Sequence, residues 1–453
     1  MMAGGVLLVA AAVRLPSELR TDEAALPVST ELCVGRPCRA NDDPRPVRGY
    51  EAPSIAVDQQ DPLHQVVADV NLVGTRCSWH VTFDGGKTWA DNEFTIPPEF
   101  AKCKLDSNGF INIGNVVMGG GGNLYVALSS PRIGAPAPRA ADEGDEDIGE
   151  SVLLASSTDG GRTFGPAREI LAGRPDRSFV RPALSVAPGP DGGDRLFLTV
   201  WGCNDGRCTE GHLLRSEDAG ATFSEPLLFT PDPGGNSPSQ PVVAADGSVY
   251  VTFLRRYPNS EAELLVARSG DDGQRFDSGV IDKQNNLGLR YEPAKIAVDP
   301  TRGWIYLVFT DTRDGPSRVF FRRSKDQGRT WERVVRLHTT GGGRSYSPSF
   351  SVAPNGRIDV VFYRRGAGEK DDVRATYSTD GGSTFAKDEA INDVPIDRKI
   401  GYWNEVGEFY APTVASTAAS AHFAWSDTRD GTPVTNTQEI FTRRIDRTEA
   451  PAA

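Results

Sequence analysis

The stretch "STDGGSTF" at residues 378–385 decides the fold, because close copies of it recur along the chain. Its pattern is Ser or Thr, any residue, Asp, any residue, Gly, any residue, Thr, and then Trp or Phe. The six copies are TFDGGKTW at 82–89, STDGGRTF at 157–164, SEDAGATF at 216–223, SGDDGQRF at 269–276, SKDQGRTW at 324–331 and STDGGSTF at 378–385. The last five begin between 53 and 59 residues apart, and such a period is typical of a stacked array of similar units.

Each residue type in the repeat suits a locked turn. An Asp side chain accepts hydrogen bonds from the backbone N–H groups that follow it, and Gly adopts backbone angles that other residues resist. The aromatic ring then anchors the turn by burying itself against a sheet. We therefore expect a structural role, and no catalytic one, for the six aspartates, which are Asp84, Asp159, Asp218, Asp271, Asp326 and Asp380.

The chain around each copy predicts four short strands. In the unit that starts at residue 292, they lie at 296–298, 304–309, 318–322 and 334–337, separated by turns. The same order starts seven times, which predicts an all-β, seven-bladed β-propeller of four-stranded antiparallel blades, with six blades as the alternative. The seventh unit has three strands and no octapeptide. We expect its outer strand to come from the N-terminal segment, around 26–34, because this would remove an exposed sheet edge.

The octapeptide resembles the Asp-box, or BNR repeat, of the sialidase superfamily, and the resemblance covers residues 50–447. In that family the box joins the third and fourth strands of a blade, away from the active site. Sialidases hold the substrate carboxylate with three arginines, and their nucleophile is a Tyr paired with a Glu. The segment GRSYSPSF at 343–350 is similar to their Tyr-Ser segment, so that Tyr346 matches the nucleophile. Glu51 stands where their first Arg would be, and no residue matches their catalytic Asp.

Loops that enter the inner strands and loops that leave the second strands meet at one end of a propeller, and here they are rich in Arg. A guanidinium group binds a carboxylate through two hydrogen bonds, and interleaved aromatic and carboxylate residues suit a sugar ring. The predicted substrate-binding residues are Arg181, Arg290, Arg344, Arg313 and Arg429, and the predicted catalytic residues are Tyr346, Glu292 and Glu51. The motif DTRDG occurs at both 311–315 and 427–431, and this repetition favours pairing between blades, with a calcium-binding loop as another option.

The six cysteines and the N-terminal residues predict export. The apolar run at 4–13 has the length of a signal-peptide core, so we assign 1–25 to a signal peptide, 26–49 to an N-terminal segment that holds the closing strand, and 50–447 to the propeller. An even cysteine number with short spacings fits an oxidising compartment. The predicted disulfides are Cys33–Cys38, Cys77–Cys103 and Cys203–Cys208, and the predicted location is secreted, periplasmic or extracellular.

Charge limits the partners. The net charge of −12 argues against nucleic acid or an anionic membrane surface, and we expect neither, nor stable membrane insertion. We expect a monomer that binds a glycan or glycoconjugate, without a cofactor other than a structural calcium ion. Three functions remain open. They are a secreted sialidase-like glycoside hydrolase for an acidic glycan, a non-catalytic carbohydrate- or protein-binding propeller, and a polysaccharide lyase with a His or Tyr base.

Overall fold

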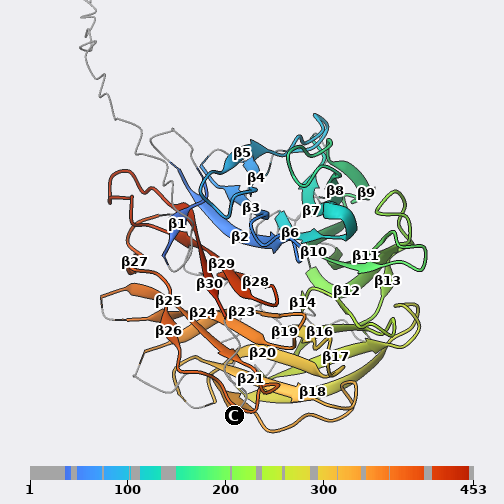
Figure 1. Cartoon of the computed structure of the whole chain (residues 1–453). Coiled ribbons are helices and arrows are strands. Elements are labelled where there is room, and N and C mark those ends of the chain that lie inside the picture. The colour runs from blue at the N-terminus through green and yellow to red at the C-terminus, as the bar shows by residue number, and fades with distance from the viewer. Residues whose placement is uncertain are drawn as a thin grey trace, which may run out of the picture.

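The computed structural model describes residues 36–41, 48–73, 76–101, 103, 113–133, 149–204, 207–230, 237–257, 261–285, 294–313, 315–337, 343–366, 368–401 and 411–447. Within these residues the protein is all-β apart from the helical turn η1 (Gly120–Gly122). Seven antiparallel sheets stand as blades around a central axis (Figure 1). The prediction of a seven-bladed propeller with four-stranded blades is confirmed.

The first three blades are meanders whose strands pair in chain order from the axis to the rim. Blade 1 consists of β2 (Tyr50–Val57), β3 (Gln65–Asn71), β4 (Arg76–Thr82) and β5 (Ala90–Glu93). Blade 2 consists of β6 (Ile113–Met118), β7 (Leu124–Pro131), β8 (Glu150–Ser157) and β9 (Arg168–Leu171). Blade 3 consists of β10 (Arg177–Pro188), β11 (Asp194–Asn204), β12 (Arg207–Ser216) and β13 (Leu227–Leu228).

Blades 4 to 6 keep this order with small additions. Blade 4 has an inner strand in two pieces, followed by three longer strands: β14 (Ser237–Pro238), β15 (Val242–Val243), β16 (Val249–Arg256), β17 (Glu261–Ser269) and β18 (Asp277–Asn285). Blade 5 consists of β19 (Lys295–Val298), β20 (Ile305–Asp311), β21 (Arg318–Ser324) and β22 (Val335–Arg336). Blade 6 consists of β23 (Ser345–Val352), β24 (Ile358–Arg365), β25 (Lys370–Ser378) and β26 (Glu389–Ala390), with β27 (Ile396–Asp397) paired to β25.

Blade 7 combines the two ends of the described chain. Its first three strands are β28 (Thr413–Ser416), β29 (Ser420–Asp427) and β30 (Glu439–Asp446), and its outer strand is β1 (Cys38–Arg39). In Figure 1 the blue β1 accordingly lies beside the red strands. The buried Glu439 of β30 forms an ion pair with Arg39 of β1, at 3.3 Å, and another with Arg48, which follows β1 in the sequence, at 2.9 Å. The predicted region 26–34 lies outside the described residues.

The core lies between blades. All residues of β3, β20 and β29 are buried, because the middle strands of a blade are covered on both faces by its neighbours. β20, with the sequence IYLVFTD, accordingly reads as an almost continuous apolar run, whereas β3 and β29 also bury polar residues such as Asp69 and His422. Between blades 6 and 7, for example, Tyr346, Tyr363 and Trp425 belong to one buried cluster.

Each Asp-box is a closed set of hydrogen bonds between the third and fourth strands of its blade. In blade 5 the Asp326 carboxylate accepts the Ser324 hydroxyl at 2.8 Å, the Thr330 backbone N–H at 2.8 Å and the Thr330 hydroxyl at 2.6 Å. The bonds from Thr330 lower the pKa of Asp326 to about 2. In the one copy without Thr, Arg275 donates its Nε–H to Asp271 at 2.9 Å instead. The carboxylate oxygens are therefore used inside the turn.

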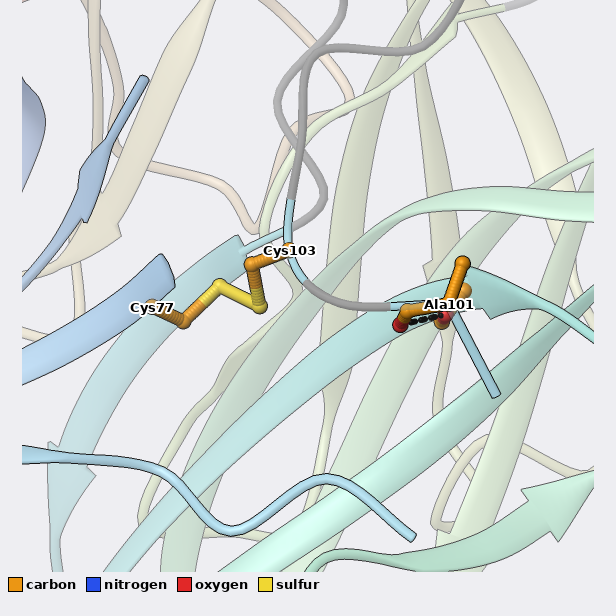
Figure 2. Close-up of a disulfide and its surroundings, with 4 residues drawn as sticks. Cys77, Ala101 and Cys103 are labelled. Atoms are coloured by element: carbon orange, nitrogen blue, oxygen red, sulfur yellow. Dashed lines mark hydrogen bonds between the residues drawn. A yellow bond between two sulfur atoms is a disulfide. The ribbon is translucent and has the colours of Figure 1, made fainter. Parts of the chain in front are cut away.

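Two of the three predicted disulfides are confirmed. Cys77 at the start of β4 is bonded to Cys103, which follows the first Asp-box, with their Cα atoms 5.4 Å apart (Figure 2). Cys203 and Cys208 face each other across the hairpin of β11 and β12. Cys38 is also disulfide-bonded, and its predicted partner Cys33 lies outside the described residues. Among the described residues, no helix is long and apolar enough to cross a bilayer.

Candidate functional site

Two adjoining cavities occupy the axis of the propeller. The mouth cavity, of about 490 Å³, lies where the inner strands begin and is lined from blades 1 to 7. The second, of about 420 Å³, lies toward the end that carries the Asp-boxes. Both are lined by five shared residues: Val116, Val117, Gln240, Ser351 and Ala415. The volume of the mouth cavity is within the range of small-ligand pockets.

Three inner strands enter the mouth with the same backbone irregularity. In β2, β10 and β23 the register shifts at the residue before a proline. That residue has a positive φ each time, 52° at Ala52, 51° at Arg181 and 48° at Ser347. Such angles cost a non-glycine residue about 1–3 kcal/mol, so the surrounding structure must enforce them. The shared backbone therefore presents a different side chain at the same place in each blade.

Arg181 is the long charged side chain among these three residues. It lines the mouth cavity, and its guanidinium carbon lies 5.0 Å from the centroid of the Trp201 ring. Trp201 is in turn buried against Val180 and Cys203, in the hairpin that the Cys203–Cys208 disulfide closes. A cation over an aromatic face is stabilised by the ring's charge distribution. Blade 3 thus holds a guanidinium group on a rigid support at the edge of the cavity.

Lys295 is a second cation in the mouth cavity, and the sequence analysis missed it. It is the first residue of β19 in blade 5 and is half-buried. No ion pair joins Lys295 to an acidic residue of the described chain, and the described lining of this cavity contains no Asp, Glu or His. In register it corresponds to Thr413 of blade 7, because Val308 and Ala424, their partners, both lie three residues before a DTRDG motif. The sequence could have indicated Lys295 through this comparison, because blade 5 has a Lys at the position where blade 7 has the small polar Thr413.

Neutral polar groups of the lining are engaged within the protein. The Asn115 amide donates to the Leu184 carbonyl at 2.8 Å and accepts the Leu184 N–H at 2.7 Å, which joins blade 2 to blade 3. Gln240 donates to the same carbonyl at 2.8 Å, and the Ser239 hydroxyl accepts the Thr252 N–H at 3.0 Å. These contacts leave the two cations as the most distinctive groups for a ligand.

Tyr346 lies at the mouth end of blade 6, buried in a ring of charges. Its hydroxyl contacts Asp371 and accepts hydrogen bonds from Arg398 at 2.7 Å and Arg365 at 3.1 Å. The Arg344 guanidinium carbon lies 5.9 Å from the ring centroid. Burial and then the Asp371 charge raise the pKa of Tyr346 to about 12, although Arg398 and Arg365 lower it. The sequence singled out Tyr346 and Arg344 but not Asp371 and Arg398.

The two DTRDG arginines have protein partners on neighbouring blades. Arg313 pairs with Asp311 and, at 2.8 Å, with Asp282 of blade 4. Arg429 pairs with Asp427 at 2.8 Å and, at 2.7 Å, with Asp393, which follows β26 of blade 6. Neither arginine lines the mouth cavity. These contacts favour the structural interpretation of the motif over substrate binding.

The remaining predicted residues divide into two groups. Glu51 is fully buried in β2 opposite Val70, and it does not line the mouth cavity. Arg290 and Glu292 lie outside the described residues, in the segment that precedes β19 in the sequence. Among the residues that are described, no group of three or more His, Cys, Asp or Glu is arranged to hold a metal ion.

Blade 1 contains a buried histidine between two carboxylates. His80 Nε2 lies 2.7 Å from Asp69, and its Nδ1 lies 2.6 Å from Asp91. Burial lowers the pKa of His80, but the two carboxylates outweigh it and raise the pKa to about 10. For Asp69 the two effects have the opposite signs. Burial raises the pKa of Asp69, the His80 charge lowers it, and the net shift is upward. His80 is therefore a cation at neutral pH, held inside the blade.

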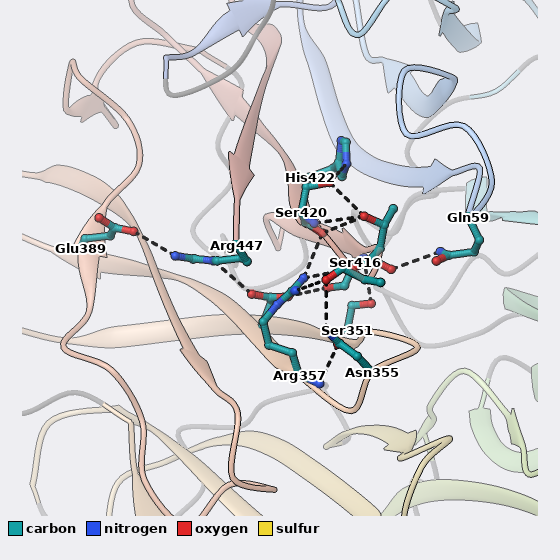
Figure 3. Close-up of polar contacts among 12 residues, drawn as sticks. Gln59, Ser351, Asn355, Arg357, Glu389, Ser416, Ser420, His422 and Arg447 are labelled. Atoms are coloured by element: carbon teal, nitrogen blue, oxygen red, sulfur yellow. Dashed lines mark hydrogen bonds and ion pairs between the residues drawn. The ribbon is translucent and has the colours of Figure 1, made fainter. Parts of the chain in front are cut away.

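At the opposite end of the axis, a polar network joins blade 6 to blade 7 (Figure 3). The buried Arg357 donates to Asp359 at 2.9 Å and to the carbonyls of Thr417, Ala418 and Ser420 at 2.9–3.0 Å. Asp359 also accepts the Ser416 hydroxyl at 2.8 Å. This network links the turn between β23 and β24 to the turn between β28 and β29.

No protein-family model and no curated protein matches the chain. Among solved structures, an ulvan lyase of family PL25 bound to -[GlcA(1-4)Rha3S]- is 12% identical, with a TM-score of 0.52 over 87% of this chain and 93% of its own. The Hadza microbial sialidase Hz136 is 18% identical, at a TM-score of 0.48 over 74% of this chain and 65% of its own. The Trypanosoma rangeli sialidase is 15% identical, with a TM-score of 0.44 over 71% of this chain and 53% of its own. The structural neighbours are thus sialidases and a polysaccharide lyase, and the likeness concerns the fold.

Proposed function

We propose that the protein acts on an acidic glycan, whose carboxylate it binds at the mouth of the axial channel. The observation that carries the proposal is Arg181, held at φ 51° against Trp201 at the edge of a cavity of about 490 Å³. Backbone strain of this kind persists where the surrounding structure enforces it, and it gathers at ligand-binding sites. A guanidinium group is the natural partner of a carboxylate.

A saccharide suits this site better than a small apolar acid. The described lining combines hydroxyl and amide side chains with aliphatic ones and holds one large aromatic ring, Phe350. The ulvan lyase, which has the same kind of fold over most of its length, is named for a polysaccharide. The two disulfides support a location outside the reducing cytosol, where such glycans are encountered.

Hydrolysis of a glycosidic bond is the second candidate function, and the Tyr346 cluster favours it. Asp371 contacts the Tyr346 hydroxyl and could accept its proton, while Arg365 and Arg398 would stabilise the phenolate. Two observations favour binding without cleavage, namely the burial of Tyr346 and its pKa of about 12. A lyase would need a base, and His212, at the mouth end of blade 3, is buried and hydrogen-bonded to Glu210 at 2.9 Å. Recognition of an acidic saccharide is therefore the function that the geometry supports best.

Calorimetric titration with matched acidic and neutral oligosaccharides tests the proposal. We expect sialylated or uronate-containing oligosaccharides to bind and their neutral counterparts not to bind. Arg181→Met should remove the binding, whereas the matched control Arg162→Met, in the Asp-box of blade 2, should keep it. Equal affinity for acidic and neutral oligosaccharides would refute the proposal.

Turnover of fluorogenic sialosides and uronides tests the hydrolase candidate. If Tyr346 is the nucleophile, Tyr346→Phe removes nearly all turnover and leaves affinity close to wild type, because only the hydroxyl is lost. If the protein only binds, no substrate is cleaved and Tyr346→Phe leaves affinity unchanged. Wild-type turnover in Tyr346→Phe would exclude the sialidase-type mechanism.

A further inference from the structure

The mouth cavity holds two cations on different blades. Arg181 enters it from β10 of blade 3, and Lys295 enters it from β19 of blade 5. Blade 4 stands between them and contributes only neutral groups to the lining, such as Ser239 and Gln240. The residues that carry the two positive charges therefore line one cavity from separate blades.

The described lining offers Lys295 no acidic partner. It contains no Asp or Glu, and Lys295 has no ion pair with an acidic residue of the described chain. In a cleft with low-dielectric walls, charges of one sign focus the field and raise the local concentration of counter-ions. An anionic ligand that reaches both cations gains from each of them, whereas a ligand with one acidic group can neutralise only one.

Hydrogen bonding from neutral groups is the other means by which a cavity selects a ligand, and it is restricted here. The Asn115 and Gln240 amides are bonded to Leu184, and the Ser351 hydroxyl accepts the Ser416 N–H at 3.1 Å. The Ser54 hydroxyl accepts the Val116 N–H at 3.1 Å. These contacts use part of the hydrogen-bonding capacity of the neutral groups, so that the number and positions of the ligand's charges contribute to selection as well.

We propose that Lys295 is a specificity-determining residue that binds a second acidic group, so that the preferred ligand is a saccharide with two anionic groups, such as a uronate that also carries a sulfate ester. This inference rests on the proposed function, in which Arg181 binds the carboxylate. Lys295 acts as a compact point charge, which suits a sulfate group approached from any side. Lys295 lines the cavity as the first residue of β19, so that the β19–β20 register fixes the place of its backbone.

The test compares matched disaccharides that differ by one sulfate group. The probes are the unsulfated, 4-sulfated and 6-sulfated unsaturated chondroitin disaccharides and the corresponding heparin-type pairs, each of which has one carboxylate. We expect the better sulfated member of at least one pair to bind at least about tenfold more tightly than its unsulfated partner, because a hydrogen bond between two charged groups is stronger than one between neutral groups. The gain should fall with added NaCl, because salt screens the interaction.

Lys295→Met then assigns the gain, because it keeps the aliphatic stem and removes the charge. We expect it to abolish the preference for sulfate and to leave the affinity for the unsulfated disaccharides within about twofold. Lys87→Met, on the exposed Asp-box of blade 1, is the matched control and should change neither value. Thermal melting of both variants shows whether each is folded.

The outcomes separate this inference from the proposed function. If unsulfated disaccharides bind through Arg181 and sulfate adds nothing, or if the sulfate preference survives in Lys295→Met, the inference is wrong and the proposed function stands. If none of the acidic disaccharides binds to the folded wild-type protein, the proposed function fails and the inference fails with it.

Discussion

The Asp-box end and the channel mouth repeat themselves in different ways. At the Asp-box end both backbone and side chains recur, since each box has an Asp carboxylate that is saturated within its own turn, as Asp326 is by Ser324 and Thr330. At the mouth only the backbone recurs, since the same bulge presents Ala52, Arg181 or Ser347. A repeated side chain is tied to a need that every blade has. A side chain that differs on a repeated backbone is free to serve a ligand.

The DTRDG motifs sharpen this contrast, because they lie at the mouth end and yet repeat. Arg313 and Arg429 each pair with an Asp of their own motif and with an Asp of the preceding blade. Their contacts are the same in both copies, as in the Asp-boxes. Position at the mouth is therefore a poorer guide to function than departure from the repeat.

The largest expected effect is on stability, from Arg357→Met at the Asp-box end of the axis. The variant leaves Asp359, which is fully buried, without its closest guanidinium partner. Breaking a buried ion pair from one side costs about 3–5 kcal/mol, and we expect that loss in urea denaturation. Affinity for acidic saccharides in the folded fraction should stay at the wild-type value. A loss of affinity without a loss of stability would reverse the roles assigned to the two ends.

Arg181→Gly should give the opposite pattern. Ligand affinity should fall about 100-fold, or about 2.7 kcal/mol, because the guanidinium partner of the carboxylate is lost. Stability should be equal to the wild type or higher by about 1 kcal/mol, because glycine adopts a positive φ without strain. Titration calorimetry and thermal melting on the same preparation measure both quantities. A strongly destabilised Arg181→Gly protein would show that Arg181 serves the fold.

Asp326→Ala should destabilise the fold by about 1–3 kcal/mol, because turn N–H groups such as that of Thr330 lose their acceptor. Asp326→Asn keeps an acceptor oxygen, so its free energy of unfolding should lie between those of the wild type and Asp326→Ala. Ligand affinity at equal folded fraction should not change in either variant. Weakened binding by a fully folded Asp326→Ala protein would contradict a purely structural Asp-box.

The pH-dependent prediction concerns His80, the buried histidine of blade 1, to which we assign no ligand. Its folded-state pKa of about 10 lies above the ordinary 6.5, so its stabilising contribution is complete below pH 6.5 and is lost as pH rises through about 10. The melting temperatures of wild type and His80→Gln should therefore converge as pH rises from 6 to 10.5. A constant difference over this range would show that His80 is not held as a cation.

The fold could be predicted because its information is periodic. Six octapeptides, the last five of them at a near-constant interval, indicate the repeated unit and the turn that closes it. The pairing of Cys203 with Cys208 followed from their short spacing, and the pairing of Cys77 with Cys103 followed because these two cysteines remained. Closure by an N-terminal strand followed from the missing strand of the last unit, although the strand observed is Cys38–Arg39.

The candidate site was less predictable, because it depends on angles and on contacts between blades. The sequence identified Arg181 as one arginine among several, but its positive φ and its support by Trp201 are properties of the folded strand. It could not show that Arg429 is paired with Asp393, or that Tyr346 is buried among charges. Lys295 was missed because a single Lys in a short inner strand resembles any solvated lysine.

The pairing of β1 with β30 has a consequence for synthesis. Arg39 and Glu439, which meet there, are 400 residues apart, whereas each of the first six blades forms from one continuous stretch of chain. Those blades can fold one after another as they leave the ribosome, but the ring stays open until β28, β29 and β30 have been made. Until then the face of blade 1 around Tyr50 and Val67, which blade 7 covers in the finished protein, has no partner. A chain that ends before residue 411 therefore has two uncovered blade faces, one on blade 1 and one on blade 6.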